Sequence, residues 1–184
     1  MKPPTSIVTP RLRLRVPSAD DAASVFEAYA QDPEVTRFVS WSPHPSVDVT
    51  RKFLAEYCAP GWARGDALNW LITLADGGHT AGMIELRVVG CRAEMGYVLA
   101  RPHWGRGLMT EAARALADWA LGEAQIHRVW AVVHLENLAS QRVLEKVGME
   151  REGVLRRWTV FANQGPTARD VWCYSRIAAR KAAP

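Results

Sequence analysis

Two glycines separated by one residue, Gly105 and Gly107, form the part of this sequence with the most recognisable chemistry. An apolar run typical of a strand precedes them and is stopped by Pro102. An apolar stripe with helical spacing follows them. A helix that begins at a glycine turn offers unpaired N–H groups and partial positive charge to an anion, and glycine lets a phosphate approach the main chain. We therefore predict that a pyrophosphate group binds at Trp104, Gly105, Arg106, Gly107, Leu108 and Met109.

This glycine turn has other interpretations. A P-loop is excluded because no lysine and no suitably placed serine or threonine accompany the glycines. A dinucleotide-binding fingerprint needs a third glycine where this sequence has Thr110, and it usually opens a chain of βαβ units. Here a long segment precedes the turn, which makes a dinucleotide-binding oxidoreductase the weakest reading. An ordinary tight turn that binds nothing stays open.

Glu94 lies on the strand that enters the glycine turn, beside the apolar residues Met95 and Tyr97. Partial burial raises the pKa of a carboxylate toward a value that suits a general base. Glu94 is therefore our candidate base, acting directly or through a water molecule. The alternative is a charged residue on the solvent face of the strand.

The string Trp-Gly-Arg-Gly-Leu-Met-Thr-Glu-Ala, which begins at Trp104, resembles the acetyl-coenzyme A loop of the GNAT (GCN5-related) N-acetyltransferases. The resemblance is to the RimJ/RimL-like branch, which contains the ribosomal-protein N-terminal acetyltransferases. The loop pattern is Gln/Arg-x-x-Gly-x-Gly/Ala, and Pro102 departs from its first position. Further segments match the family in order and extend the resemblance over nearly the whole chain: 9–15, 32–41, 92–99, 137–148 and 152–156.

The resemblance implies an α/β (α+β) protein with a GNAT-type fold, in which a single mixed, largely antiparallel central sheet is flanked by helices. It implies an N-acetyltransferase with acetyl-CoA as its cosubstrate, in which a primary amine attacks the thioester directly. A non-catalytic CoA-binding or ribosome-associated module of the same fold is the alternative.

The resemblance also assigns roles on the cofactor side. Ser140 would donate a hydrogen bond to the departing thiolate. Asn137 would contact the pantetheine arm, and its plainer reading is a helix N-cap. Main-chain N–H groups would bind the thioester carbonyl and the pantetheine amides near Val98, Leu99 and Ala100.

Three arginines are candidates for the phosphates of the cofactor. Arg106 is the better candidate because it lies inside the glycine turn, whereas Arg101 precedes it. Arg142 is a candidate for the outer end of the cofactor.

The acceptor wall is expected from the loop at 38–44, the helix through Tyr57 and the last hairpin. Its candidate substrate-binding residues are Trp41, Tyr57 and Trp158. These aromatic segments suit a protein N-terminal α-amine or a small primary amine. An α-amine has a pKa of about 7.7–8.0, so a modest base suffices at neutral pH. Asp48 and Glu56 are the acids we find there, so we do not expect a polyamine acceptor.

The composition fits one domain over residues 1–184, large enough for a real core. The net charge of +4 is mild, and no basic cluster predicts direct nucleic-acid binding. Cys58, Cys91 and Cys173 are widely separated, which predicts free thiols in the cytoplasm and no metal site. No apolar run approaches a membrane span, and we expect a monomer or a homodimer.

The apolar periodicity and the turn residues place the secondary structure. Strands are expected at 7–16, 68–74, 80–89, 93–100, 127–135, 153–161 and 168–177. Helices are expected from 18 or 20 to about 30, from 32, at 47–62, from 108, and from 137 to the stop at Gly148. Residues 68–100 should form an antiparallel meander with a hairpin turn at Asp76-Gly77-Gly78.

Overall fold

The computed structural model describes residues 2–178, which build one sheet with the strand order β1-β2-β3-β4-β5-β6-β8-β7. Its neighbours are antiparallel except β5 and β6, which are parallel. This is the expected single mixed, largely antiparallel sheet. The strands are β1 Ser6–Val8, β2 Leu12–Arg15, β3 Ala67–Leu74, β4 Thr80–Val89, β5 Arg92–Leu99, β6 Arg128–His134, β7 Glu150–Thr159 and β8 Arg169–Ile177.

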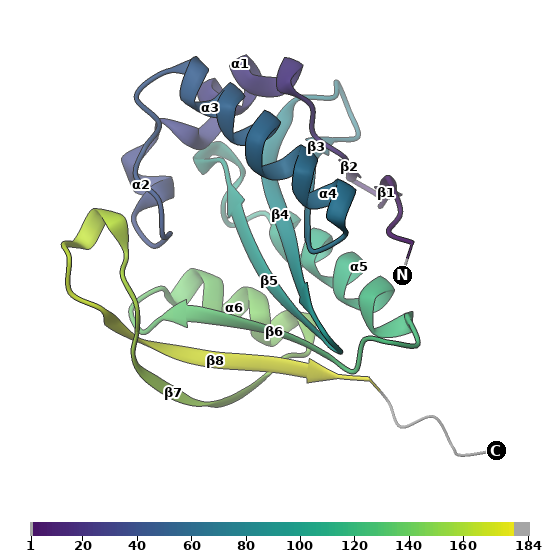
Figure 1. The fold of residues 1–184 in the computed structure, drawn as a ribbon, viewed down its shortest axis with the longest axis vertical. Helices are drawn as coiled ribbons and strands as arrows, with labels where there is room; N and C mark the ends of the chain where they lie inside the picture. The colour runs from purple at the N-terminus through teal and green to yellow at the C-terminus, as the bar shows by residue number, and fades with distance from the viewer. Residues whose placement is uncertain (1, 179–184) are drawn as a thin grey trace.

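Helices cover both faces of this sheet. Figure 1 shows α3 and α4 in front of the central strands, and α5 and α6 behind the sheet. The helices are α1 Ala22–Val25, α2 Pro33–Thr36, α3 Val47–Phe53, α4 Ala59–Arg64, α5 Leu108–Gly122 and α6 Leu138–Val147. A π-helical turn, Phe26–Ala30, extends α1, and another, Leu54–Cys58, joins α3 to α4. None of the helices in residues 2–178 has the length and apolar character needed to cross a membrane.

Each face of the sheet has its own apolar core. The larger core lies under α5, because the stripe Leu108, Ala112, Leu116 and Ala120 recurs every four residues and is buried. The smaller core lies under α1 and the Leu54–Cys58 turn. Successive residues of a strand point to opposite faces, so the central strands β3, β4 and β5 contribute to both cores.

The parallel pair β5 and β6 touches over a very short length. The register pairs Arg92 with Arg128, Ala93 with Val129, and Glu94 with Trp130, and it ends there. Figure 1 shows the two strands starting side by side and then diverging toward their carboxyl ends. We call this divergence of β5 and β6 beyond Glu94 and Trp130 the fork.

The N-terminal strand differs from expectation. The alternating segment at 7–16 is not one strand but a hairpin, in which β1 and β2 pair antiparallel. Pro10 has no N–H to donate to a ladder, and the Thr9 N–H donates to the Leu12 carbonyl at 2.9 Å to close the turn. Alternation survives a tight hairpin, so the pattern alone did not reveal the break. The expected meander over 68–100 is confirmed.

Gly82 on β4 yields a prediction about stability. A Cβ at this position would lie 2.3 Å from the Val98 carbonyl oxygen on β5, closer than any real contact. Gly82→Ala should therefore lower the free energy of unfolding by about 1–3 kcal/mol, the usual cost of overpacking. Urea unfolding measures this, with Gly122→Ala as the control because its Cβ would meet nothing within 4 Å. Equal stability of the two variants would contradict the close packing of β4 on β5.

Candidate functional site

The predicted sequence of strand, glycine turn and helix is present at the start of α5. Gly105 and Gly107 have φ values of 73° and 74°, in the left-handed region that side chains with a Cβ rarely adopt. Gly107 is the N-cap of α5, and its carbonyl accepts the first helical bond from the Glu111 N–H at 3.1 Å. The amides of Leu108, Met109 and Thr110 therefore precede the first helical hydrogen bond, as an anion site requires.

The β1–β2 turn holds this glycine turn in place. The Glu111 carboxylate accepts from the Thr9 hydroxyl at 2.6 Å, from the Arg11 N–H at 2.9 Å and from Arg11 Nε at 2.7 Å. Arg11 Nη1 also donates to the Arg106 carbonyl at 2.9 Å. Burial opposes ionisation of Glu111, but these hydrogen bonds prevail and lower its pKa. Arg11 was missed from the sequence because its partner is a hundred positions away.

Positive charge gathers beside the glycine turn. Arg11 and Arg106 line a pocket of about 420 Å³ between the β1–β2 turn, the β3–β4 hairpin and the start of α5, to which Asp76 and His79 also contribute. Arg101 instead lies 3.3 Å from Asp32 through its Nε atom. Of the two arginines next to the glycine turn, Arg101 and Arg106, only Arg106 thus lines the pocket.

The main chain of β5 presents one of the three predicted positions to the fork. The Ala100 N–H donates to the Ala81 carbonyl at 2.8 Å, so Ala100 and, by alternation, Val98 direct their main-chain groups toward β4. Leu99 directs its groups to the opposite edge, where its carbonyl accepts from the Trp104 indole N–H at 2.7 Å. This hydrogen bond places the exposed indole of Trp104 at the edge of the fork.

Ser140 lies on the α6 side of the sheet, against Tyr97. Asn137 caps α6 by accepting from the Ser140 N–H at 3.1 Å. The Ser140 hydroxyl and the Tyr97 hydroxyl are 2.8 Å apart. Burial raises the pKa of Tyr97, so its hydroxyl stays protonated. The sequence pattern predicts Tyr97 only as a strand residue, whereas its hydroxyl is part of this pair. Arg142 is exposed farther along α6.

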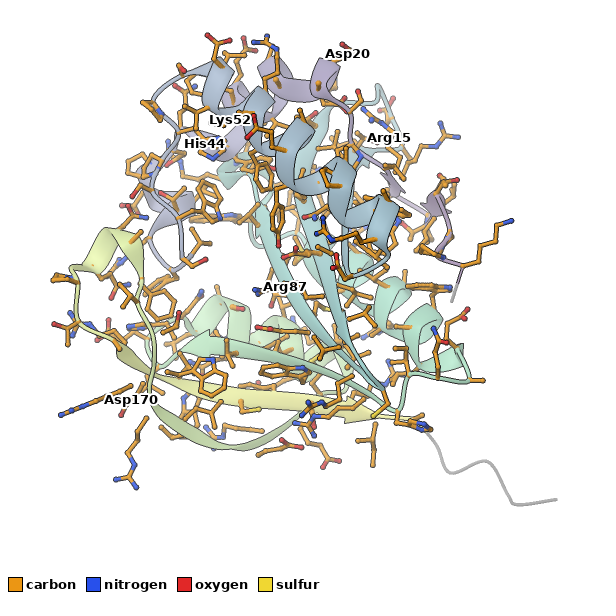
Figure 2. The ribbon with its side chains drawn as sticks, viewed as in Figure 1. Arg15, Asp20, His44, Lys52, Arg87 and Asp170 are labelled. Carbon is orange, nitrogen blue, oxygen red and sulfur yellow. The ribbon has the colours of Figure 1, made fainter. Side chains whose placement is uncertain are left out.

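Glu94 lies on the opposite face, with the helices α1–α4. Its side chain is 22% exposed and its Oε1 is 3.3 Å from Arg87 Nη2. Burial raises the pKa of Glu94, Arg87 lowers it, and Glu85 raises it; the result is an increase. Figure 2 shows the labelled Arg87 between α4 and β6. Glu94 is therefore half-buried, as the sequence argument required of a base.

The three predicted acceptor residues are not equally near Glu94. The Tyr57 hydroxyl donates to Glu85 Oε1 at 2.6 Å, which joins Tyr57 to the charged group around Glu94. Trp158 is half-exposed and packs edge-on against Trp130, the residue paired with Glu94, at 6.4 Å between ring centroids. Trp41 packs against the smaller core, with its ring tilted relative to that of His44 at 5.1 Å between ring centroids.

These groups lie on either side of the sheet, next to the point where the β5–β6 pairing ends. Glu94 projects from one face of the sheet, and the Ser140–Tyr97 hydroxyl pair lies on the other. β5 and β6 separate directly after Glu94, so their ladder does not continue between these two sets of groups. Within residues 2–178, no group of three or more His, Cys, Asp or Glu side chains is arranged to hold a metal ion.

The sequence matches a known family over most of its length. The family model described as "Acetyltransferase (GNAT) domain" matches residues 11–150. The chain is 32% identical to the "Uncharacterized protein YkkB" of Bacillus subtilis (strain 168), over 86% of this chain and 92% of that protein. It is 30% identical to the "Putative ribosomal N-acetyltransferase YdaF" of the same organism, over 83% and 85%. The "Spermidine N(1)-acetyltransferase" of Escherichia coli (strain K12) is 30% identical over 42% of this chain and 44% of that protein.

Solved structures share the fold. An acetyltransferase of the GNAT family from Bacillus anthracis superposes with a TM-score of 0.81 at 25% identity, over 94% of this chain and 98% of that one. The ribosomal L7/L12 alpha-N-protein acetyltransferase RimL, solved with coenzyme A, superposes with a TM-score of 0.82 at 22% identity, over 93% and 96%.

The Glu111 contacts predict a pH-dependent stability. Glu111→Gln should lower the free energy of unfolding at pH 7 by about 1–3 kcal/mol, because Arg11 loses a charged partner. Folding lowers the pKa of Glu111, so its stabilisation is complete above the ordinary glutamate pKa of about 4.3 and is lost as pH falls through the folded pKa.

Urea unfolding of both proteins across this pH range tests it, with the exposed Glu27→Gln as the matched control. The difference from the unmodified protein should be largest near neutrality and shrink in acid. A difference that does not change with pH would show that the charge of Glu111 contributes nothing.

Proposed function

The chain belongs to the GNAT family of acetyltransferases, whose cosubstrate is acetyl-CoA, and we propose that it transfers the acetyl group to a primary amine by direct attack. The observation that carries this proposal is the fork. The half-buried carboxylate of Glu94 lies on one face of the sheet where β5 and β6 part, and the hydroxyl pair of Ser140 and Tyr97 lies on the other, which supports a reaction between them.

The residues around the glycine turn fit the cosubstrate. Gly105 and Gly107 carry no Cβ that would hold a phosphate away, and the first amides of α5 are available to an anion. Arg11 and Arg106 add positive charge at the adjoining pocket. The Leu99 N–H, which points away from β4, suits a carbonyl group of the bound cosubstrate.

In the reaction that we propose, Glu94 accepts a proton from the acceptor ammonium. A C–N bond forms, the thioester C–S bond breaks, and the acceptor nitrogen gives up two protons in total. One is taken by Glu94 and released to solvent, and the other ends on the sulfur. The Ser140 hydroxyl, held by Tyr97, donates a hydrogen bond to the developing thiolate, and the Leu99 N–H is the candidate donor for the thioester carbonyl.

The acceptor that we propose is the α-amine of a protein N-terminus or a small primary amine. The relationship to YdaF, over most of both chains, supports a peptide end. The acids of the acceptor wall suit a polyamine poorly, because Asp48 pairs with Arg51, and Glu56 lies 3.8 Å from Lys52. We also place the protein in the cytoplasm, where its free thiols Cys58, Cys91 and Cys173 would stay reduced.

Thiol release from acetyl-CoA tests this function, with tetrapeptides, free amino acids, phenethylamine and spermidine as acceptors. Turnover should be seen with a peptide or with a small amine and should exceed that with spermidine. Binding of acetyl-CoA without turnover of any amine would instead support the non-catalytic module. Spermidine as clearly the best acceptor would contradict the proposed acceptor class.

Glu94 yields a kinetic prediction. Glu94→Gln should lower kcat by about 100-fold or more, the usual contribution of a general base, while acetyl-CoA binding is kept. In the unmodified protein, kcat/KM should fall in acid as Glu94 is protonated, with the limb above the ordinary glutamate pKa because burial raises it. Arg87→Met removes the charge that lowers this pKa and should move the limb to higher pH.

Ser140→Ala should lower kcat by about tenfold, the value of one hydrogen bond to a charged group. An effect on acetyl-CoA affinity alone would assign Ser140 to binding.

For Glu94, the contradicting result is near-normal turnover by Glu94→Gln with an acid limb at the same pH as in the unmodified protein. That result would remove Glu94 from the mechanism.

A further inference from the structure

Gly96 has no side chain, so the main chain of β5 is uncovered next to the candidate base. It lies between Glu94 and Val98 on the same face of the strand, by alternation. A Cβ built on Gly96 would meet one described atom within 4 Å outside its chain neighbours, Glu85 Oε2 at 3.9 Å. The space directly above this part of β5 is therefore open, and one wall of it is a carboxylate.

Glu85 is held in place across from Gly96. The two residues are paired in the β4–β5 register. Glu85 Oε1 accepts from the Tyr57 hydroxyl at 2.6 Å and from Asn69 Nδ2 at 3.4 Å. These bonds hold the carboxylate in one position. Because the Glu85 side chain is only 17% exposed, a ligand bound to it would lose part of its water.

Arg87 connects Glu85 to the candidate base. Its Nε lies 3.5 Å from Glu85 Oε2, and its Nη2 lies 3.3 Å from Glu94 Oε1. One guanidinium thus faces two carboxylates, which leaves one net negative charge around the bare surface of Gly96. A single positive charge from a ligand would balance it.

We propose that Glu85 and Gly96 form the slot for the acceptor ammonium: Glu85 binds the cation, and the bare Gly96 surface gives room for the carbon that bears the amine. This inference rests on the proposed acetyl transfer and deepens it by naming what selects the acceptor. Glu85 binds the protonated amine, and the neighbouring Glu94 then takes one proton from it. The slot lies on the α1–α4 face, opposite the Ser140–Tyr97 pair, so changes here should leave acetyl-CoA binding intact.

Glu85→Gln keeps the shape and the bond from Tyr57 but removes the charge. It should raise the KM for the acceptor by about tenfold or more, the value of a hydrogen bond to a charged group, with a much smaller change in kcat. The Kd of acetyl-CoA, measured by titration calorimetry, should stay the same. Glu27→Gln is the matched control, because Glu27 is an exposed carboxylate distant from Glu85 in the sequence.

Gly96→Ala adds one methyl group to the slot without a steric clash, since 3.9 Å is an ordinary contact. It should penalise acceptors branched next to the amine. We expect kcat/KM for an Ala-initiated tetrapeptide to fall about tenfold relative to its Gly-initiated counterpart, within the range for one methylene in a pocket. Phenethylamine and its α-methyl derivative give the same comparison for small amines, and Gly122→Ala is the control.

The outcomes separate the two proposals. Turnover by the unmodified protein, together with an acceptor KM unchanged in Glu85→Gln or an unchanged preference in Gly96→Ala, overturns the slot and leaves the acetyltransferase intact. A loss of kcat alone in Glu85→Gln also overturns it, because Glu85 would then act on Glu94. No turnover of any amine by the unmodified protein contradicts the proposed function, and the slot with it. Circular dichroism confirms that each variant folds.

Discussion

The three-residue pairing of β5 with β6 is the constraint on which the rest of this structure depends. Parallel neighbours need a crossover connection, and here α5 supplies it. The glycine turn lies at the start of that crossover because the chain must leave the end of β5 and enter the helix. The pairing ends at Glu94, so the fork opens directly beside the candidate base. A longer ladder would close the fork and bury the main chain of Leu99 in a β5–β6 pairing.

The sheet separates two kinds of chemistry that one reaction needs together. Charged groups lie on the α1–α4 face, where Arg87 contacts both Glu85 and Glu94. Neutral hydroxyls lie on the α6 face, where burial keeps Tyr97 protonated. A carboxylate placed beside the thiolate would oppose its formation, whereas a hydroxyl stabilises it. In the reaction that we propose, this separation would give the amine and the sulfur the environments that suit each.

Local patterns predicted the parts of the site that are local. The glycine turn, the position of Glu94 and the Asn137 cap are each defined within a few residues, and the meander follows from alternation and its turn. The family resemblance added the fold.

The missed contributions depend on register or on distant segments. The register of β4 against β5, which the length of their turn sets, places Glu85 opposite Gly96. A shift of this register by one residue would move the Glu85 side chain to the other face of the sheet. Arg11 meets Glu111 through the packing of a hairpin that alternation made look like one strand.

The central claim concerns where a ligand lies, and a crystal structure with coenzyme A tests it most directly. The account predicts the pyrophosphate at Gly105–Gly107, the pantetheine arm in the fork along Leu99, and the sulfur within reach of the Ser140 hydroxyl. Coenzyme A bound elsewhere, with no part of it between β5 and β6, would contradict the account.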